Sequence, residues 1–403
     1  MNRYDHPRQM EPMMPGASPQ LVQRAMEVYR ESASLESMLH PTTRVEVTRI
    51  LRHINSYYSN RIEGEHTTPA EIERAVRKEY SSDESKRRLQ QLSMAHIDVQ
   101  ELIDQWFEKE PGISVCSADF LCRIHREFYN RVPELFLEVR SSSSEEVIRM
   151  EPGRVRDRMV SVGRHLPPEP EHIGSFMTRF AEAYHPEGLS GHKKLLAAAA
   201  SHHRLSWIHP FLDGNGRVCR LFSYAYMKHI HLDSLGLWSW SRGAARKSDE
   251  YRQMLALADS PRQGDLDGRG LLSEKGLAQF SDFFFEVAHD QIRFMAGLLQ
   301  LDSLRERIYG YAHLRSEKLI PEEESLRIES KYLLAEAMTR GEVPRGEVSR
   351  ITGLADRTAR DLVHQLEEEE LLTSTSHRAP LRFHIPGRAL GYYFPQLYPE
   401  GTL

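Results

Sequence analysis

The chain has 403 residues, a length that suits two or three structural units with substantial cores. Apolar residues make up 40% and charged residues 28%, the composition of a soluble globular protein. A net charge of -5 argues against a surface that attracts nucleic acid as a whole, but it leaves room for a local basic patch. The three cysteines lack metal-ligand spacing, and their odd number suggests free thiols. No stretch resembles a signal peptide or a membrane span, so we expect a cytoplasmic protein with no membrane partner.

Most of the chain before residue 130 has helical patterning. Residues 1 to about 20 are polar and rich in Met and Pro, and we expect them to be poorly ordered. The following stretch predicts helices over 19–38, 41–63, 69–108 with a break near 81–83, and 117–130. The second of these helices should end at Gly64, because glycine is a common residue just past a helix C-terminus.

A loop and a short hairpin are expected next. The four serines at 141–144 predict a loop. Residues 152–168 run from Pro-Gly-Arg to Pro-Pro and contain one apolar cluster, formed by Met159, Val160 and Val162. We interpret this segment as a short β-hairpin.

The most informative stretch runs from Ile208 to Arg220. It holds one imidazole, one carboxylate, a Gly-Asn-Gly turn and two guanidinium groups. A strong helix former precedes it, and apolar residues at helical spacing follow it, so the motif connects two helices through a polar loop. The amides and dipole at the start of the second helix favour an anion. Arg217 and Arg220, spaced i, i+3 on its first turn, strengthen this preference because guanidinium groups match phosphate oxygens.

A separate unit is expected from about Pro321. A helix over 329–338 is followed by a helix-turn-helix pattern in 345–353 and 356–370, in which Leu362, Val363 and Leu366 should face inward. Residues 373–384 predict a β wing. The whole resembles a winged helix-turn-helix.

The residues from His209 to Arg220, His-Pro-Phe-Leu-Asp-Gly-Asn-Gly-Arg-x-x-Arg, resemble the core motif of Fic-domain proteins. The resemblance implies a mainly α fold, with a helical Fic core, a short β-hairpin flap at 152–168 and a winged helix-turn-helix domain after it. The expected domains are an N-terminal helical region at 1–110, a catalytic domain at 111–315 and the winged unit at 320–403.

This resemblance implies transfer of AMP from ATP to a protein hydroxyl. His209 would be the general base, since the imidazole pKa lies near neutrality. Asp213 would hold Mg²⁺, a hard cation that prefers oxygen ligands. Arg217 and Arg220 would clamp the β- and γ-phosphates. At Gly214, Asn215 and Gly216 the backbone would approach the phosphates closely. The side chain of Asn215 would donate a hydrogen bond to the α-phosphate.

Three further residues are expected near the nucleotide. Val218 and Cys219 belong to the same nucleotide-binding stretch. The thiol of Cys219 lies one position off the buried stripe and has no base at helical spacing, so we interpret it as a packing residue and not as a nucleophile. Tyr251 is assigned to the adenine pocket through the resemblance alone. His202 and His203, at the end of the preceding helix, are interpreted as packing residues.

A second motif stands far upstream, in the sequence Ser59-Asn60-Arg61-Ile62-Glu63-Gly64. A carboxylate in the last turn of a helix faces the negative end of the dipole, so a cationic partner elsewhere would offset a mildly unfavourable position. The Ser-x-x-x-Glu-Gly pattern resembles the inhibitory motif of Fic proteins. The resemblance implies that Glu63 pairs with Arg220 and keeps the γ-phosphate out of its productive position.

Several functions stay open at this stage. The first is an autoinhibited adenylyltransferase that modifies Tyr, Thr or Ser of target proteins and of itself; a related enzyme would remove AMP, with Glu63 activating water. The non-enzymatic alternative is a nucleotide-sensing regulator that binds DNA through Arg357, Thr358, Arg360 and His364. Four acids at 367–370 end that helix, so protein docking is favoured over DNA. Relatives with this architecture often pair, which makes a homodimer an expectation.

Overall fold

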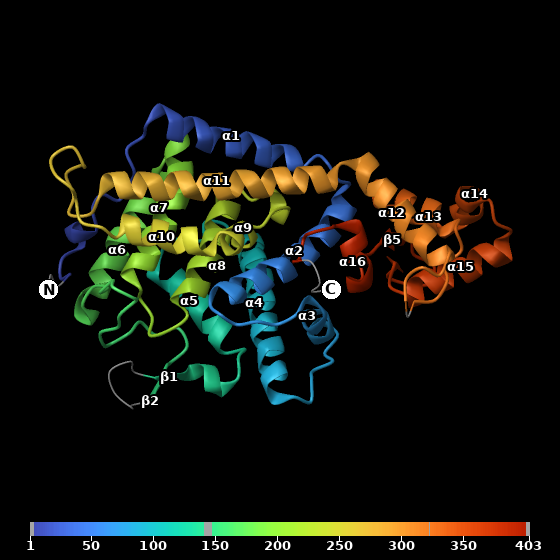
Figure 1. Ribbon diagram of the computed structural model, residues 1–403, viewed down its shortest axis with the longest axis horizontal. Helices are drawn as coiled ribbons and strands as arrows, with labels where there is room; N and C mark the ends of the chain where they lie inside the picture. The colour runs from blue at the N-terminus through green and yellow to red at the C-terminus, as the bar shows by residue number, and fades with distance from the viewer. Residues whose placement is uncertain (1–3, 141–146, 322, 400–403) are drawn as a thin grey trace.

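The computed structural model describes residues 4–140, 147–321 and 323–399, and the chain is mainly helical (Figure 1). The serine run at 141–144, expected as a loop, lies outside the described residues. The helices before residue 320 are α1 (Pro19–Leu35), α2 (Pro41–Ile62), α3 (Pro69–Val76), α4 (Glu84–Lys109), α5 (Ala118–Tyr129), α6 (Ile173–Tyr184), α7 (His192–Ile208), α8 (Asn215–His229), α9 (Trp240–Arg246), α10 (Ser248–Ala258), α11 (Glu274–Leu299) and α12 (Leu301–Ser316).

Local sequence explains where many of these helices begin. The side chains of Ser18, Asp83 and Ser117 each accept a hydrogen bond from the amide three residues later, at 3.2, 3.0 and 3.1 Å. Proline occupies the first position of α1, α2 and α3, where its missing N–H costs nothing. Helix α2 ends as predicted, since Gly64 follows it with φ +85°.

Helix α2 crosses the molecule and is buried along most of its length. Its apolar residues at helical spacing face the core, and none of them is more than 3% exposed: Val47, Ile50, Leu51, Ile54 and Tyr58. The helix packs against α4 and α9. In Figure 1, α1 and α11 lie side by side along one edge of the molecule, over α7. Helices α7 and α8 pack together, and residues 209–214 form the loop between them.

The expectation that the first 20 residues are poorly ordered is wrong for the described residues 4–20. They include a 3-10 helix, η1 (Pro7–Met10), that packs on α6. Met10 and Met13 are 0% and 3% exposed, and the Glu11 carboxylate pairs with Arg179 at 2.5 Å. The methionines that suggested a polar tail instead bury their long apolar side chains in the bundle.

Two small hairpins precede α6. Strands β1 (Glu138–Arg140) and β2 (Val147–Arg149) pair antiparallel, a hairpin that the sequence analysis did not predict. Within 152–168, the expected hairpin consists of one bridge in which Val162 and His165 exchange two backbone hydrogen bonds of 3.0 Å. The apolar cluster expected to support it is not a buried core, since Met159 is 50% exposed.

The C-terminal unit contains the elements that the sequence predicts. Its helices are α13 (Ser330–Arg340), α14 (Val348–Thr352), α15 (Asp356–Glu368) and α16 (Gly387–Tyr393). Strands β3 (Glu342–Val343), β4 (Leu372–Thr373) and β5 (Leu381–Phe383) form an antiparallel sheet in the order β3-β5-β4. Leu362, Val363 and Leu366 of α15 are buried, as their spacing predicts.

The last described segment returns to the helical bundle. Tyr58 on α2 donates a hydrogen bond to the Leu397 carbonyl at 3.2 Å, and Arg242 on α9 donates to the Leu397 and Gln396 carbonyls at 3.1 and 2.7 Å. In Figure 1, α16 therefore lies close to α2 and α3 although it is more than 300 residues away in sequence. In the described part of the chain, no helix combines the length and apolarity needed to cross a bilayer.

Candidate active site

The loop between α7 and α8 is held in an unusual backbone conformation. His209 ends α7 with φ 50° and ψ 61°, in the left-handed region that side chains other than glycine seldom adopt. Gly214 precedes α8 with φ +77°, and a Cβ there would lie 2.3 Å from the hydroxyl of Tyr129. Asn215 braces the loop, because its side chain accepts from the Phe211 amide at 2.9 Å and donates to the Phe211 carbonyl at 2.8 Å.

The role expected for Asn215 stays a prediction. One of the two hydrogens on its amide nitrogen is committed to Phe211, and the other is available to a phosphate. The Val218 amide donates to the Gly214 carbonyl at 2.9 Å and closes the first helical turn. The amides free for an anion are therefore those of residues 215–217, since the first N–H groups of a helix have no partner within it.

Arg156 fixes the position of His209. Its Nε donates to the His209 carbonyl at 2.8 Å and its Nη2 donates to the Pro168 carbonyl at 2.6 Å. Burial lowers the pKa of His209 to about 4, and nearby Arg156 adds to the lowering, while Glu63 acts in the opposite direction. The imidazole is consequently neutral at pH 7 and able to accept a proton.

Two guanidinium groups are buried at the start of α8. Arg217 and Arg220 are 6% and 4% exposed. Arg217 donates from Nε to the Asn60 side-chain oxygen at 3.3 Å, and among the described residues it has no carboxylate within ion-pair distance. Arg220 alone has an acidic partner, Glu63. The site thus holds two buried positive charges and one contacting negative charge, an excess that suits a phosphorylated ligand.

Glu63 and Arg220 meet as the upstream motif suggests. Nη2 of Arg220 lies 2.6 Å from Oε1 of Glu63, across 157 positions of sequence. The same guanidinium donates from Nε to the Ser59 hydroxyl at 2.9 Å and from Nη2 to the Ser59 carbonyl at 3.0 Å. The end of α2 therefore covers the start of α8 and occupies one arginine of the motif.

Glycine at position 216 permits this contact. A Cβ on Gly216 would lie 2.2 Å from Oε1 of Glu63, well inside contact distance. The carboxylate is buried against the protein on one side, but the side chain keeps 32% of its exposure. Burial opposes its ionisation, yet Arg220 and Arg217 together hold the pKa of Glu63 below its usual range, so it is ionised at pH 7.

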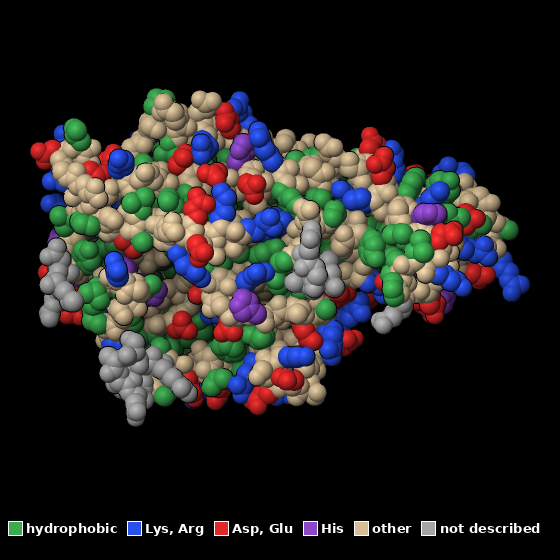
Figure 2. All heavy atoms as spheres, in the orientation of Figure 1, with side chains coloured by type: hydrophobic (Ala, Val, Ile, Leu, Met, Phe, Trp, Pro, Cys, Tyr) green, Lys and Arg blue, Asp and Glu red, His purple; other side chains and the backbone are tan. Residues whose placement is uncertain are grey.

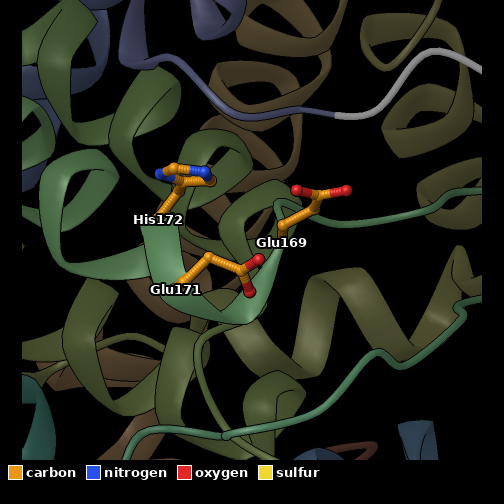
Figure 3. Close-up of side chains that lie close together, drawn as sticks. All are labelled: Glu169, Glu171 and His172. Carbon is orange, nitrogen blue, oxygen red and sulfur yellow. The ribbon is translucent and has the colours of Figure 1, made fainter.

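Asp213 is exposed and suits a hard cation. Its backbone carbonyl interacts with His125 at 3.3 Å, while its carboxylate has no hydrogen bond or ion pair among the described residues. An exposed carboxylate close to two buried arginines has the donor chemistry for Mg²⁺. Elsewhere, Figure 3 shows Glu169, Glu171 and His172, whose ligand atoms lie within 4.8 Å of one another. Their side chains leave the backbone in different directions and are at least partly exposed, so we assign no metal to them.

Tyr251 lies close to the motif but inside the core. It is 4% exposed, and its hydroxyl is 2.7 Å from Nε2 of His202, whose Nδ1 is 2.6 Å from the Ser223 hydroxyl. The adenine assignment of Tyr251 stays a prediction. The packing interpretations are confirmed: His202 and His203 are 0% exposed, and burial raises the pKa of the Cys219 thiol to about 12.

Sequence reasoning missed two residues of the site. Asn60 contacts Arg217, and Arg156 anchors the loop that carries His209. Asn60 stands beside Ser59 in the upstream motif, so its position was a usable signal. Arg156 sits in an irregular segment, and no periodicity or spacing connects it to His209.

Comparisons with known proteins find a family match over the region that contains the 209–220 loop. The model of the Fic/DOC family matches residues 115–227. A protein adenylyltransferase Fic from Nematostella vectensis is 29% identical over 192 residues, which span 46% of this chain and 39% of that protein. A protein adenylyltransferase Fic from Drosophila erecta is 42% identical over 72 residues, 18% of this chain and 14% of that protein. The chain therefore spans less than half the length of these relatives.

Solved structures share the fold at low sequence identity. A crystal structure of a Fic family protein from Desulfovibrio desulfuricans G20 has a TM-score of 0.54 and 17% identity, covering 92% of this chain and 98% of that one. Fic-1 (residues 134–508) from C. elegans has a TM-score of 0.51 and 16% identity, covering 70% and 73% of the two chains.

Proposed function

We propose that this Fic-domain protein is an autoinhibited adenylyltransferase that moves AMP from ATP to a Tyr, Thr or Ser hydroxyl of target proteins and of itself. The observation that carries the proposal is the pair of buried guanidinium groups, Arg217 and Arg220, beside a neutral buried imidazole at His209. A phosphorylated ligand would neutralise the charge that Glu63 leaves unmatched. The names of the relatives, protein adenylyltransferase Fic, support the same chemistry.

The reaction makes one bond and breaks one. The target oxygen attacks the α-phosphorus of ATP, its proton passes to an imidazole nitrogen of His209, and the bond to pyrophosphate breaks. His209 is neutral at pH 7, so it is ready to accept this proton. The free amides of residues 215–217 stabilise charge on the phosphate oxygens. When bound at Asp213, Mg²⁺ would neutralise further phosphate charge.

Autoinhibition follows from the contact between Glu63 and Arg220. Both hydrogens on Nη2 of Arg220 are in use, one donated to Glu63 at 2.6 Å and one to the Ser59 carbonyl at 3.0 Å, so Nη2 has none left for a γ-phosphate in this arrangement. The carboxylate itself would also repel phosphate oxygens that approach Gly216. Movement of the last turn of α2, or loss of the carboxylate, frees the arginine.

Incorporation of labelled AMP tests this function. The Glu63→Gly variant should incorporate AMP into protein at least about tenfold faster than the wild type, since one freed phosphate contact contributes about 1.4 kcal/mol or more. Adding His209→Ala should abolish the incorporation. If Glu63→Gly does not gain activity, the inhibitory role is wrong. If it instead loses an AMP-removing activity that the wild type has, Glu63 serves hydrolysis and the reverse reaction is the function.

The C-terminal unit is proposed as a winged helix-turn-helix that docks protein. On α15, Arg357, Arg360 and His364 are exposed, but His364 pairs with Glu368 at 3.1 Å. Arg345 pairs with Glu367 at 2.5 Å, so acids on the helix already neutralise nearby cations. On the face shown in Figure 2, acidic and basic side chains are interspersed over this unit. DNA binding needs several uncompensated phosphate contacts, which this arrangement does not favour.

A further inference from the structure

A cavity of about 520 Å³ lies where the C-terminal unit meets the helical bundle. Its walls come from α2, from α3 and from the returning segment 384–398, together with Ile320. The volume is in the range of pockets that hold small organic molecules. The cavity is separate from the loop at 209–220, because none of those residues lines it.

Apolar side chains dominate the walls, and the charged ones are already paired. Ile50, Pro69, Val76, Leu390, Tyr392 and Tyr398 supply apolar surface. Of the three arginines at the cavity, Arg49 pairs with Glu46 at 2.7 Å and Arg77 pairs with Glu73 at 3.0 Å and Glu370 at 2.5 Å. The third, Arg388, lies 3.6 Å from Glu369. An anionic ligand would compete with these carboxylates for the arginines, whereas an uncharged ligand would not.

His53 supplies a polar group for such a ligand. Its side chain lines the cavity and is 8% exposed, and it has no hydrogen bond among the described residues. Burial lowers the pKa of His53 to about 3, with Arg49 and Arg52 adding to the effect, so the ring is neutral. A neutral imidazole offers one donor and one acceptor. A ligand hydroxyl could hydrogen-bond to either of them.

The cavity and the inhibitory contact are built on the same helix. His53 and Glu63 are ten positions apart on α2, about 15 Å along its axis. Between them, Tyr58 donates to the Leu397 carbonyl, and Tyr57 packs edge-on against Tyr398 with ring centroids 5.1 Å apart. A ligand between α2 and the segment 384–398 would therefore contact the same helix that carries Glu63 at its end.

We propose that this cavity binds a small, uncharged, mainly apolar molecule that carries a hydroxyl group for His53, and that binding strengthens the contact between Glu63 and Arg220. The binding step stands on the cavity alone, and its effect on AMP transfer rests on the function proposed above. A ligand that binds this arrangement of α2 more tightly than one in which its last turn has moved favours the inhibited state by that difference in affinity.

Binding is tested with 2-naphthol and with 2-naphthoate, which has the same rings and a carboxylate in place of the hydroxyl. In methyl-labelled protein, 2-naphthol should shift the resonances of Ile50, Ile320 and Leu390, and 2-naphthoate should bind at least about tenfold more weakly. The Ala70→Trp variant, which fills the cavity from an exposed position, should lose the shifts. Val45→Trp, which adds the same side chain at a site 70% exposed outside the cavity, should keep them.

No shift with 2-naphthol, equal binding of 2-naphthoate, or equal binding of 2-naphthol to Ala70→Trp overturns the binding proposal.

Coupling between the cavity and the Glu63–Arg220 contact is measured by amide hydrogen exchange of residues 59–63. Binding of 2-naphthol should slow this exchange by about fivefold, the low end of typical coupling. AMP incorporation by the wild type should fall by a similar factor, while Glu63→Gly should not respond. Unchanged exchange, or equal inhibition of Glu63→Gly, refutes the coupling. If the wild type and Glu63→Gly both lack AMP transfer, the proposed function fails while the exchange result still decides the coupling.

Discussion

Replacing Glu63 with glutamine should lower the free energy of unfolding by about 2 kcal/mol at pH 7. Removing one partner of a fully buried ion pair costs about 3–5 kcal/mol, because the other charge stays buried and unpaired. The Arg220 side chain is 2% exposed, but that of Glu63 is 32% exposed, so water screens part of the interaction and the expected cost is smaller. Glutamine keeps the shape and can still accept a hydrogen bond, so the loss reports mainly on charge.

The loss of unfolding free energy caused by Glu63→Gln should depend on pH. Arg220 and Arg217 hold the pKa of Glu63 below its ordinary value of 4.5 in the folded protein. A lowered pKa in the folded state means that the stabilisation is fully present above the unfolded value and is lost as pH falls through the folded value. The difference between the wild type and Glu63→Gln should therefore be constant from pH 7 to about pH 5 and shrink below pH 4.5.

Urea unfolding at a series of pH values measures both effects. A suitable control is Glu182→Gln, which removes a carboxylate that is 63% exposed and 3.9 Å from Arg179, and which should change stability little at any pH. Equal stability of Glu63→Gln and the wild type at pH 7 would refute the assignment of Glu63 as a counter-ion. So would a loss of stability that does not change between pH 7 and pH 3.

Three further predictions concern the loop. In the Glu63→Gly background, AMP transfer should fall with acid at or below about pH 4, the pKa of His209, and a midpoint near 6.5 in the pH–rate profile would contradict this. Gly214→Ala should lower the unfolding free energy by about 1–3 kcal/mol in urea titrations, because φ is +77° there and a Cβ would meet Tyr129. Arg156→Ala should reduce kcat about 10- to 100-fold in the Glu63→Gly background by loosening His209, and an unchanged kcat would refute that positioning role.

Local features of the fold were predictable from the sequence. Helix α2 has apolar residues at helical spacing, a proline at its start and Gly64 after its end, and all three signals agree with the structure. The inward face of α15 was predictable for the same reason. Residues 4–20 were predicted wrongly, because composition alone does not distinguish a solvated tail from a segment whose methionines pack against helices far away in the sequence.

Contacts between residues far apart in the sequence were harder to predict. The approach of Glu63 to Arg220 could be anticipated only because both motifs resemble those of one family. Arg156 could not be assigned, because it binds the backbone carbonyls of His209 and Pro168. Every residue has a backbone carbonyl, so the residue types at these positions do not indicate the contact. The cavity beside His53 was also hidden, because it forms only when residues 384–398 return to α2.

The proposed reaction is AMP transfer, and Glu63 is proposed to restrain it. Intact-protein mass spectrometry of Glu63→Gly, after incubation with ATP and Mg²⁺, tests both proposals together. We predict added masses equal to whole AMP groups on the variant, none on Glu63→Gly combined with His209→Ala, and much less on the wild type. An unmodified variant, or a gain of the size of a phosphate group, would rule out AMP transfer restrained by Glu63.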